Sequence, residues 1–330
     1  MAIAISPFFI TGLTDAEGSF IASITRNPLT RLGYTISLRF NITMHLRDSL
    51  LVKTIRAFFN NIGVYKESGS FCYLDVNSIA DLEFIIEHFL RYPLLSSKRN
   101  SFYIFKIIFD IIKTKEHLSL QGFLLVVAYI NILNTPIKIN TLSEITSKFG
   151  PLPIISLCPV VLLSSRSVFL YILNNPLWIS GFVCGEGSFT YYKGFKTSTK
   201  GIQKTNIQMG FECSQITSDS YLLQALLYYF GVGILYQDNT VSRIRITQIK
   251  HLQHIIIPFF IRYPLCGFKQ KQYETWLKVV ILLISEPNSI DRNAKIITVT
   301  NELTSLHKKK LTRSWPIPPS VLRMVGGTYR

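Results

Sequence analysis

The amino-acid sequence carries one short phrase twice, and this repeat constrains the fold more than any other feature. Residues 10–20 read Ile-Thr-Gly-Leu-Thr-Asp-Ala-Glu-Gly-Ser-Phe, and residues 179–189 read Ile-Ser-Gly-Phe-Val-Cys-Gly-Glu-Gly-Ser-Phe. Each copy holds a glycine, a small residue four positions later, one acid, and then Gly-Ser-Phe. Two copies of one acidic motif predict two carboxylates related by a pseudo-twofold axis. On a basic chain, such acids favour bound cations and a symmetric polyanionic partner.

The two halves match well beyond this motif. Glu17 and Glu186 are 169 positions apart, whereas Lys98 and Lys269 are 171 apart, and the segment Arg-Tyr-Pro-Leu recurs at 91–94 and 262–265 with the same offset of 171. The offset changes once, after the motif, which predicts two extra residues in a hairpin loop of the second copy. A register that continues over so many residues indicates a duplicated domain and not the short unit of a solenoid.

Each half predicts the same order of elements. A helix ends at the acid, and a hairpin with alternating apolar residues follows, as at Ile36, Leu38 and Phe40. A helix (48–60 and 219–230), a second hairpin (roughly 64–76 and 234–247) and helices on either side of Tyr-Pro-Leu come next. We therefore expect an α+β fold of two pseudo-symmetric αββαββα domains, 1–140 and 171–310. Residues 141–170 are the predicted inter-domain linker, and residues 311–330 the predicted basic, proline-rich tail.

The composition favours a polyanionic partner. The 330 residues carry a formal charge of +16, and 48% of them are hydrophobic, so a sizeable core is available. Nucleic acid and a membrane surface are the usual partners for such a charge. A long apolar run, 123–133, is shorter than the ~20 residues that a spanning helix needs, so we expect no membrane span.

Cysteine and histidine give no sign of a zinc site or a disulfide framework. The five cysteines are scattered, and no Cys-x-x-Cys pair exists. His251 and His254 have helical spacing, but they favour a surface or core role over metal binding. The many Ile, Asn, Lys, Phe and Tyr residues are those that AT-rich codons give, which indicates an organellar gene.

Small residues lie on one stripe of each motif helix, Gly12 with Ala16 and Gly181 with Gly185. Small side chains at this spacing let two helix backbones approach closely. We therefore expect the two motif helices to pack against each other as the interface between the domains. Gly18 and Gly187 are expected to form the left-handed caps that end these helices.

Each motif places its acid, Glu17 or Glu186, at a helix C-terminus. The helix dipole is negative there, so the position is unfavourable for an acid, and a broken local rule often marks function. A hard divalent cation such as Mg²⁺ resolves the conflict, because it takes oxygen ligands and leaves room for water and phosphate. Metals so placed activate water and stabilise a leaving oxygen in phosphodiester hydrolysis. A solvated helix end is the alternative for either acid alone, and the match between the copies favours the metal site.

These features resemble the LAGLIDADG homing endonuclease family in its single-chain, two-repeat form, over most of residues 7–310. The resemblance implies a saddle of two domains, with antiparallel β-ribbons in the major groove of double-stranded DNA and the motif acids over the scissile phosphates. It also implies a monomer that cuts both strands of a long asymmetric site and leaves short 3′ overhangs. Members are typically encoded in organellar introns, so a mitochondrial location is expected.

The resemblance also implies roles for the matching motif residues. Glu17 and Glu186 would bind Mg²⁺, and the carbonyl groups of Ala16 and Gly185 would face the metals. Mn²⁺ is expected to substitute for Mg²⁺, whereas Ca²⁺ is expected to bind without supporting cleavage.

Basic and amide residues near the acids complete the implied catalytic set. Lys98 and Lys269 would organise water or steady the developing charge, and Gln215 would support them. The repeats differ at two of the family positions: Met44 stands where the second repeat has Gln215, and Cys184 stands where the first has Asp15. These departures leave the ligands intact but favour unequal cutting of the two strands.

The polar faces of the two long hairpins and of one later strand are candidate DNA-reading surfaces. A two-stranded ribbon fits the major groove, where each base pair shows a distinct pattern of donors and acceptors. Glu212 is expected to accept a hydrogen bond from a cytosine amino group, and Arg243 and Arg245 to contact base edges or phosphates. An ordinary solvated sheet face is the alternative for any one residue. The full set is Ser23, Thr25, Arg26, Thr35, Ser37, Arg39, Asn41 and Thr43 in the first half, and Tyr191, Lys193, Asn206, Gln208, Glu212, Ser214, Arg243 and Arg245 in the second.

Three other functions compete with a DNA endonuclease. The first is a maturase that binds intron RNA on the same fold, and the intact acids favour cleavage over it without excluding splicing. The second is a cleavage-silent DNA-binding protein, which Met44 and Cys184 keep open. The third, a basic protein of the membrane surface, is disfavoured because no predicted helix sets one wholly basic face against an apolar one.

Overall fold

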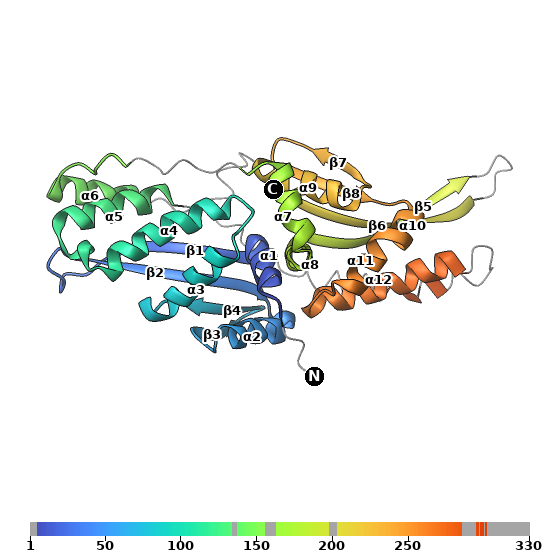
Figure 1. The fold of residues 1–330 in the computed structure, drawn as a ribbon, viewed down its shortest axis with the longest axis horizontal. Helices are drawn as coiled ribbons and strands as arrows, with labels where there is room; N and C mark the ends of the chain where they lie inside the picture. The colour runs from blue at the N-terminus through green and yellow to red at the C-terminus, as the bar shows by residue number, and fades with distance from the viewer. Residues whose placement is uncertain are drawn as a thin grey trace. The chain divides into compact units, whose positions relative to one another are not determined.

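The computed structural model describes residues 5–133, 137–155, 163–197, 203–285, 295–296, 298–299 and 301. The chain divides into two compact units, Met1–Leu163 and Ser164–Arg330, and each contains one four-stranded antiparallel sheet (Figure 1). The predicted α+β class, with one sheet per repeat, is therefore confirmed. The predicted tail, 311–330, lies outside the described residues.

From the motif helix onward both units contain the predicted order of elements. The first contains α1 (Pro7–Glu17), β1 (Gly18–Arg26), β2 (Tyr34–His45), η1 (Leu46–Asp48), α2 (Ser49–Phe58), β3 (Val64–Ser68), β4 (Phe71–Val76), α3 (Ile79–Arg91), α4 (Lys98–Lys113), η2 (Glu116–Leu118), α5 (Leu120–Ile132) and α6 (Ile139–Phe149). The second contains α7 (Ser165–Asn174), α8 (Leu177–Glu186), β5 (Gly187–Thr197), β6 (Gln203–Ile216), η3 (Thr217–Asp219), α9 (Ser220–Phe230), β7 (Ile234–Gln237), β8 (Val241–Ile246), α10 (Ile249–His251), η4 (Leu252–Ile256), α11 (Ile257–Arg262) and α12 (Gly267–Ser285). In the first unit α5 and α6, and in the second α7, are additional helices.

The two sheets have equivalent topologies. The strand order is β1-β2-β4-β3 in the first and β5-β6-β8-β7 in the second. The β1–β2 ladder ends at the pair Arg26–Tyr34, whereas the β5–β6 ladder continues to the pair Thr197–Gln203. The second hairpin is therefore the longer one, which accounts for the two extra residues that the change of offset predicts.

One face of each sheet packs on helices through a duplicated aromatic core. In the first unit the ring of Phe20 lies 5.3 Å from Phe40 and 5.4 Å from Phe89, between centroids, so that α3 covers the β1–β2 hairpin (Figure 1). In the second unit the equivalent ring, Phe189, lies 5.5 Å from both Phe211 and Phe260. Aromatic pairs at such spacings contribute about 0.5–1.5 kcal/mol each beyond the burial of their surface. The polar side chains of the hairpins are left on the other face of each sheet.

The glycines that end the motif helices do not have the predicted conformation. Gly18 has φ −82° and ψ 158°, and Gly187 has φ −82° and ψ 155°, so both are extended and the prediction of left-handed caps is wrong. The strand starts directly at each glycine, so no left-handed turn is needed. A Cβ atom on Gly18 would lie 2.4 Å from Cγ2 of Thr14, and one on Gly187 would lie 2.4 Å from Cγ1 of Val183. Glycine is therefore needed here for space.

Helices α5 and α6 pack on the far end of the first hairpin. The ring of Tyr34 lies 5.8 Å from Phe123 and 6.5 Å from Phe149, between centroids, and Arg26 forms an ion pair with Glu144 of α6. Part of the predicted linker, 141–170, is thus helical, since α6 continues to Phe149 and α7 begins at Ser165.

No single described helix is both long and apolar enough to cross a membrane, whereas the bent pair α7 and α8 meets the criteria of length and composition when its two helices are counted together.

The four described cysteines, Cys72, Cys184, Cys213 and Cys266, are free thiols.

Candidate functional site

The acid of the first motif lies beside a lysine at the end of α1. Glu17 is the last residue of this helix, and its side chain is exposed. Lys98, the first residue of α4, donates hydrogen bonds from Nζ to the carbonyl oxygens of Ala16 at 2.8 Å and of Thr14 at 3.2 Å. This ammonium group offsets the negative end of the helix dipole next to the acid. The structure therefore brings together the first predicted acid and its predicted lysine.

Buried Asp15 holds the segment that leads to Lys98. Its side chain is 1% exposed and accepts hydrogen bonds from the backbone N–H groups of Leu95 and Ser96, both at 2.9 Å, and from Ser96 Oγ at 2.6 Å. Because Leu95 and Ser96 come just before α4, Asp15 fixes the start of this helix relative to α1. The sequence alone identifies Asp15 as a variable motif position and gives no sign of this anchoring role.

The second motif has the same plan with different contacts. Glu186 closes α8 and is half-buried. Lys269, in the first turn of α12, is 9% exposed, and its Nζ donates a hydrogen bond to the carbonyl oxygen of Gly187 at 2.6 Å. Cys213 pairs with Gly187 across the hairpin. Burial raises the pKa of the Cys213 thiol, the Glu186 carboxylate raises it further and the Lys269 ammonium group lowers it, so this neutral thiol lies within electrostatic range of both charges.

Cys184 takes the place of Asp15 in the second repeat. The backbone N–H group of Cys266 donates to Cys184 Sγ at 3.5 Å, and Cys184 Sγ donates to the Cys266 carbonyl oxygen at 3.6 Å. Sulfur is a weak donor and a weak acceptor, so these contacts are weaker than the charged hydrogen bonds of Asp15. The difference between the motifs therefore lies in the anchor of a loop and leaves each acid and lysine in place.

Gln215 makes a local contact in the structure. Its Oε1 accepts a hydrogen bond from the backbone N–H group of Ile216 at 2.8 Å. Met44, at the equivalent point of the first repeat, is buried. A role for Gln215 in a water network stays a prediction.

The polar face of the first sheet combines exposed side chains with a shallow groove. Asp75 accepts a hydrogen bond from Asn41 Nδ2 at 2.7 Å, Thr43 donates to Asn41 Oδ1 at 2.6 Å, and Lys66 Nζ lies 3.7 Å from Asp75 Oδ2. Lys66 and Asp75 lie outside the predicted set, which in this repeat covers only the long hairpin. Of the predicted set, Thr35, Asn41 and Thr43 are half-buried, and the exposed members are Ser23, Thr25, Arg26, Ser37 and Arg39. The groove is lined by Arg39, Asn41, Thr43, Lys66, Glu67, Ser68, Tyr73 and Asp75.

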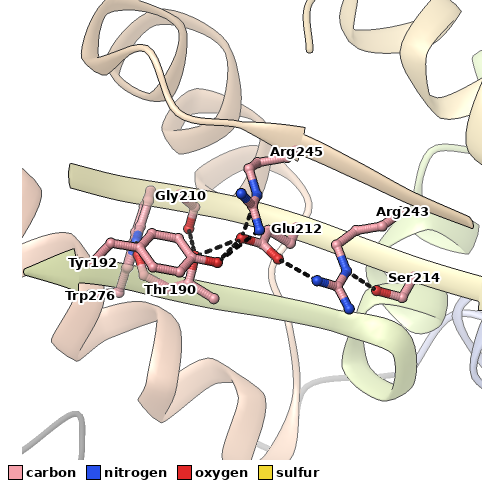
Figure 2. Close-up of polar contacts among 8 residues, drawn as sticks. All are labelled: Thr190, Tyr192, Gly210, Glu212, Ser214, Arg243, Arg245 and Trp276. Carbon is pink, nitrogen blue, oxygen red and sulfur yellow. Dashed lines mark hydrogen bonds and ion pairs between the residues drawn. The ribbon is translucent and has the colours of Figure 1, made fainter. Parts of the chain in front are cut away.

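The polar face of the second sheet carries a charged network, the Glu212 cluster, which consists of Glu212, Thr190, Tyr192, Arg243 and Arg245 (Figure 2). Glu212 is 5% exposed, and its Oε1 accepts hydrogen bonds from the hydroxyl groups of Tyr192 and Thr190. Arg245 Nε lies 2.9 Å from Glu212 Oε1, and Arg243 Nη1 lies 3.8 Å from Oε2. Both carboxylate oxygens therefore face partners within the protein, and this geometry does not favour the predicted contact with cytosine.

The guanidinium group of Arg245 makes cation–π contacts with two tyrosine rings. Its guanidinium carbon lies 5.1 Å from the ring centroid of Tyr192 and 5.6 Å from that of Tyr236, and Nη2 donates to the Tyr192 hydroxyl at 3.1 Å. Burial, followed by the hydrogen bond to Glu212, raises the pKa of Tyr192. Arg243 donates from Nε to Ser214 Oγ at 3.1 Å. One carboxylate thus faces two guanidinium groups, and the cluster keeps a net positive charge.

Two residues of the predicted DNA-reading set whose side chains are described lie on the opposite face of their strands, and Lys193, which pairs with Ile207, stands at a third such position of the backbone register. Tyr191 pairs with buried Met209, and Arg26 pairs with buried Tyr34. Residues that are directly opposite each other share a face of the sheet, so both lie on the helix-packed face. Tyr192 lies on the polar face and was missed, although alternation from the apolar start of the strand indicates it. Gln208 is exposed, while the side chains of Lys193 and Asn206 lie outside the described ones.

The side chain of each motif acid can bind a hard cation only if backbone carbonyl groups, water or phosphate supply the other oxygen ligands. In the described part of the chain, no three His, Cys, Asp or Glu side chains gather closely enough to hold a metal ion. Each motif offers one carboxylate and nearby carbonyl oxygens, which are ligands that Mg²⁺ accepts while it keeps several waters and binds phosphate. The Ala16 carbonyl oxygen accepts from Lys98 and has a second lone pair. These oxygen donors fit the predicted ion.

The chain thus contains two copies of one α+β unit, and each copy holds an acid at the end of its motif helix, α1 or α8, with a lysine beside it. The model of the LAGLIDADG endonuclease family matches residues 10–109 and 179–280, so the chain belongs to this family.

The chain is similar in sequence to curated fungal proteins and in fold to solved structures of DNA-bound proteins. A Neurospora crassa protein named "Probable intron-encoded endonuclease 3" is 30% identical over 287 residues, which cover 86% of this chain and 51% of that protein. The chain thus spans about half the length of this relative. The structure of I-SmaMI bound to cleaved DNA has 25% identity and a TM-score of 0.76, covering 89% of this chain and 95% of that one. The structure of I-CpaMI bound to uncleaved DNA has 28% identity and a TM-score of 0.76, covering 89% and 97%.

Proposed function

We propose that this protein is a site-specific DNA endonuclease that cuts both strands of a long asymmetric target by metal-dependent phosphodiester hydrolysis and leaves short 3′ overhangs. Membership of the endonuclease family and the DNA-bound state of similar structures support this proposal. The protein acts as a monomer, since one chain supplies both repeats. Its gene lies in a mitochondrial intron: the name of the Neurospora relative, which calls that protein intron-encoded, supports the intron, and the AT-rich type of composition supports the organelle.

The observation that carries the proposal is the paired acid and lysine at the end of each motif helix. In each repeat the acid directly precedes the first strand of the long hairpin, so it lies at one end of the polar sheet face. The lysine ammonium group lies on a carbonyl oxygen within one residue of the acid, Ala16 in the first repeat and Gly187 in the second. Each repeat thus supplies one carboxylate and one lysine ammonium group, and this set suits the hydrolysis of one phosphodiester bond in each DNA strand.

The oxygen donors at the helix ends define the expected metal ligands. Glu17 and Glu186, with the carbonyl oxygens of Ala16 and Gly185, would hold Mg²⁺. Mn²⁺ would substitute for it, and Ca²⁺ would bind without supporting cleavage. When bound, the ion supplies Lewis acidity that activates water and stabilises the leaving oxygen.

The lysines and the sheet faces have complementary tasks. Lys98 and Lys269 hold positive charge beside the acids, where they orient water and steady the charge that develops on the phosphate. The polar faces of the two hairpins read bases in the major groove, with Tyr192 taking the place proposed for Tyr191. The formal charge of +16 supplies a sequence-independent attraction that weakens as salt increases.

A selection for cleaved sequences from a random duplex library tests the proposed function. Three arms are needed: the wild-type chain with Mg²⁺, the wild-type chain with Ca²⁺, and the Glu17→Gln, Glu186→Gln double variant with Mg²⁺. We expect one long asymmetric site that is cut only in the first arm. A folded wild-type chain that cuts no sequence with Mg²⁺ or Mn²⁺ would overturn the proposal, and retained binding to intron RNA would then favour a maturase.

A further inference from the structure

We infer that Glu212 is a positioning residue that reads no base itself and orders Arg245 to recognise a guanine in the target. This inference rests on the proposed function and deepens it, because it assigns a specificity role within the second repeat. The evidence is the geometry of the Glu212 cluster (Figure 2).

The carboxylate of Glu212 is too enclosed to contact DNA directly. It is 5% exposed, and its two oxygens face Thr190, Tyr192, Arg243 and Arg245. A buried charge is strongly disfavoured unless it is paired and hydrogen-bonded, so these contacts determine where Glu212 can lie. The structure even leaves room for them: a Cβ atom on Gly210 would lie 2.7 Å from Thr190 Oγ1. Glu212 is therefore an internal anchor.

Arg245 is the group that this anchor presents. Arg245 Nε lies within ion-pair distance of Glu212, and Nη2 donates a hydrogen bond to the Tyr192 hydroxyl. Neither of these two contacts uses the N–H groups of Nη1. The side chain is 32% exposed on the polar face of the sheet. Fixing the guanidinium plane before binding lowers the entropy lost when the complex forms. Guanine offers two acceptors, N7 and O6, in the major groove and is the base that arginine recognises most often.

The first sheet has an acid, Asp75, at the position that Arg245 occupies in the second sheet. Glu212 of β6 pairs with Arg245 of β8, whereas the equivalent pair of the first sheet is Asn41 with Asp75. Asp75 accepts from Asn41 and faces Lys66 at 3.7 Å. An arginine held by a buried acid is thus a feature of the second repeat at this position. The guanine preference is therefore expected in only one half of the target.

A binding selection with a random duplex DNA library tests this inference at the level of single base pairs. The full-length chain is used with Ca²⁺, and the base preferences of the wild type are compared with those of Arg245→Ala, Glu212→Gln and Tyr192→Phe. Asp75→Asn is the matched control, because it neutralises a buried acid on the same face of the other sheet. Thermal unfolding of each variant shows whether it is folded.

We expect Arg245→Ala to remove a guanine preference at one position. Glu212→Gln should weaken the preference at that same position about tenfold and leave the other positions unchanged. Tyr192→Phe should have the same effect to a smaller degree, and it decides the outcome if Glu212→Gln does not fold. Asp75→Asn should change preferences only in the other half of the target.

Three results would overturn the inference. The first is a Glu212→Gln variant that binds more weakly at all positions with unchanged base preferences, since a merely structural role predicts that result. The second is an Arg245→Ala variant with no change in base preference. The third is the appearance of a cytosine preference that depends on Glu212 and not on Arg245. A wild-type chain that binds no DNA would instead refute the proposed function, so the two failures are distinguishable.

Discussion

Replacing Asp15 with asparagine should loosen the start of α4 and displace Lys98. At least three donors among the described residues, two of them backbone N–H groups, bond to this buried carboxylate. Hydrogen bonds to a charged group contribute about 1.5–3 kcal/mol each, and an unpaired buried donor costs about 1–3 kcal/mol. Asparagine keeps one acceptor oxygen and turns an amide N–H₂ group toward the remaining donor. We therefore expect Asp15→Asn to reduce the local stability by about 3 kcal/mol.

Hydrogen exchange of the Leu95 and Ser96 amides measures this effect directly. A loss of about 3 kcal/mol corresponds to exchange that is roughly a hundredfold faster. Cys184→Ser is the matched control, because it changes the equivalent loop anchor and should cost less than about 1 kcal/mol. Unchanged exchange at Leu95 and Ser96, or an equal effect of Cys184→Ser on its own loop, would refute the reasoning. Cleavage of one target strand should also slow more than that of the other, which a duplex labelled on each strand reveals.

Three further predictions concern acid stability, a helix junction and metal. Burial lowers the pKa of His88 from 6.5 to about 3, so below pH 6.5 the unfolded chain takes up a proton that the folded chain excludes, and stability falls. The variant His88→Phe places the residue of the equivalent position, Phe259, in the first repeat. Between pH 7 and pH 5 its free energy of unfolding in urea should fall by about 2 kcal/mol less than that of the wild type. An unchanged pH dependence would contradict this. Gly18→Ala should lower the free energy of unfolding by about 1–3 kcal/mol, because its Cβ meets Thr14, and an unchanged melting temperature would show that the junction has room. Chelation with EDTA should abolish DNA cleavage reversibly, and cleavage that persists in EDTA would exclude the proposed metal role.

Local pattern and the internal repeat were sufficient to predict the framework. Alternation at Phe40 and its neighbours indicates a strand with one apolar face, and the same positions recur at Phe211, so both aromatic cores follow from the sequence. The change of offset even indicates which hairpin is longer. These features depend on residues that are close in sequence or related by the repeat, and pattern reasoning handles both cases.

Features that depend on distant partners could not be predicted. The role of Asp15 depends on backbone groups 80 and 81 positions away. The burial of Glu212 depends on two arginines that a later strand brings beside it. Gly18 was misassigned because the sequence does not show that the strand begins without an intervening turn. Alternation in the sequence favours Tyr192 over Tyr191: Phe189, the third residue of β5, lies on the apolar face of the sheet, so the even-numbered residues of this strand lie on the polar face.

Separate Glu17→Gln and Glu186→Gln variants, assayed for cleavage and binding of the selected target, test the central claim most directly. The account predicts that each variant loses double-strand cleavage with Mg²⁺ and binds the target with a Kd within about tenfold of the wild-type value, a change of about 1.4 kcal/mol. Either variant that still linearises the target plasmid, with normal dependence on Mg²⁺, would contradict the assignment of one essential acid to each repeat.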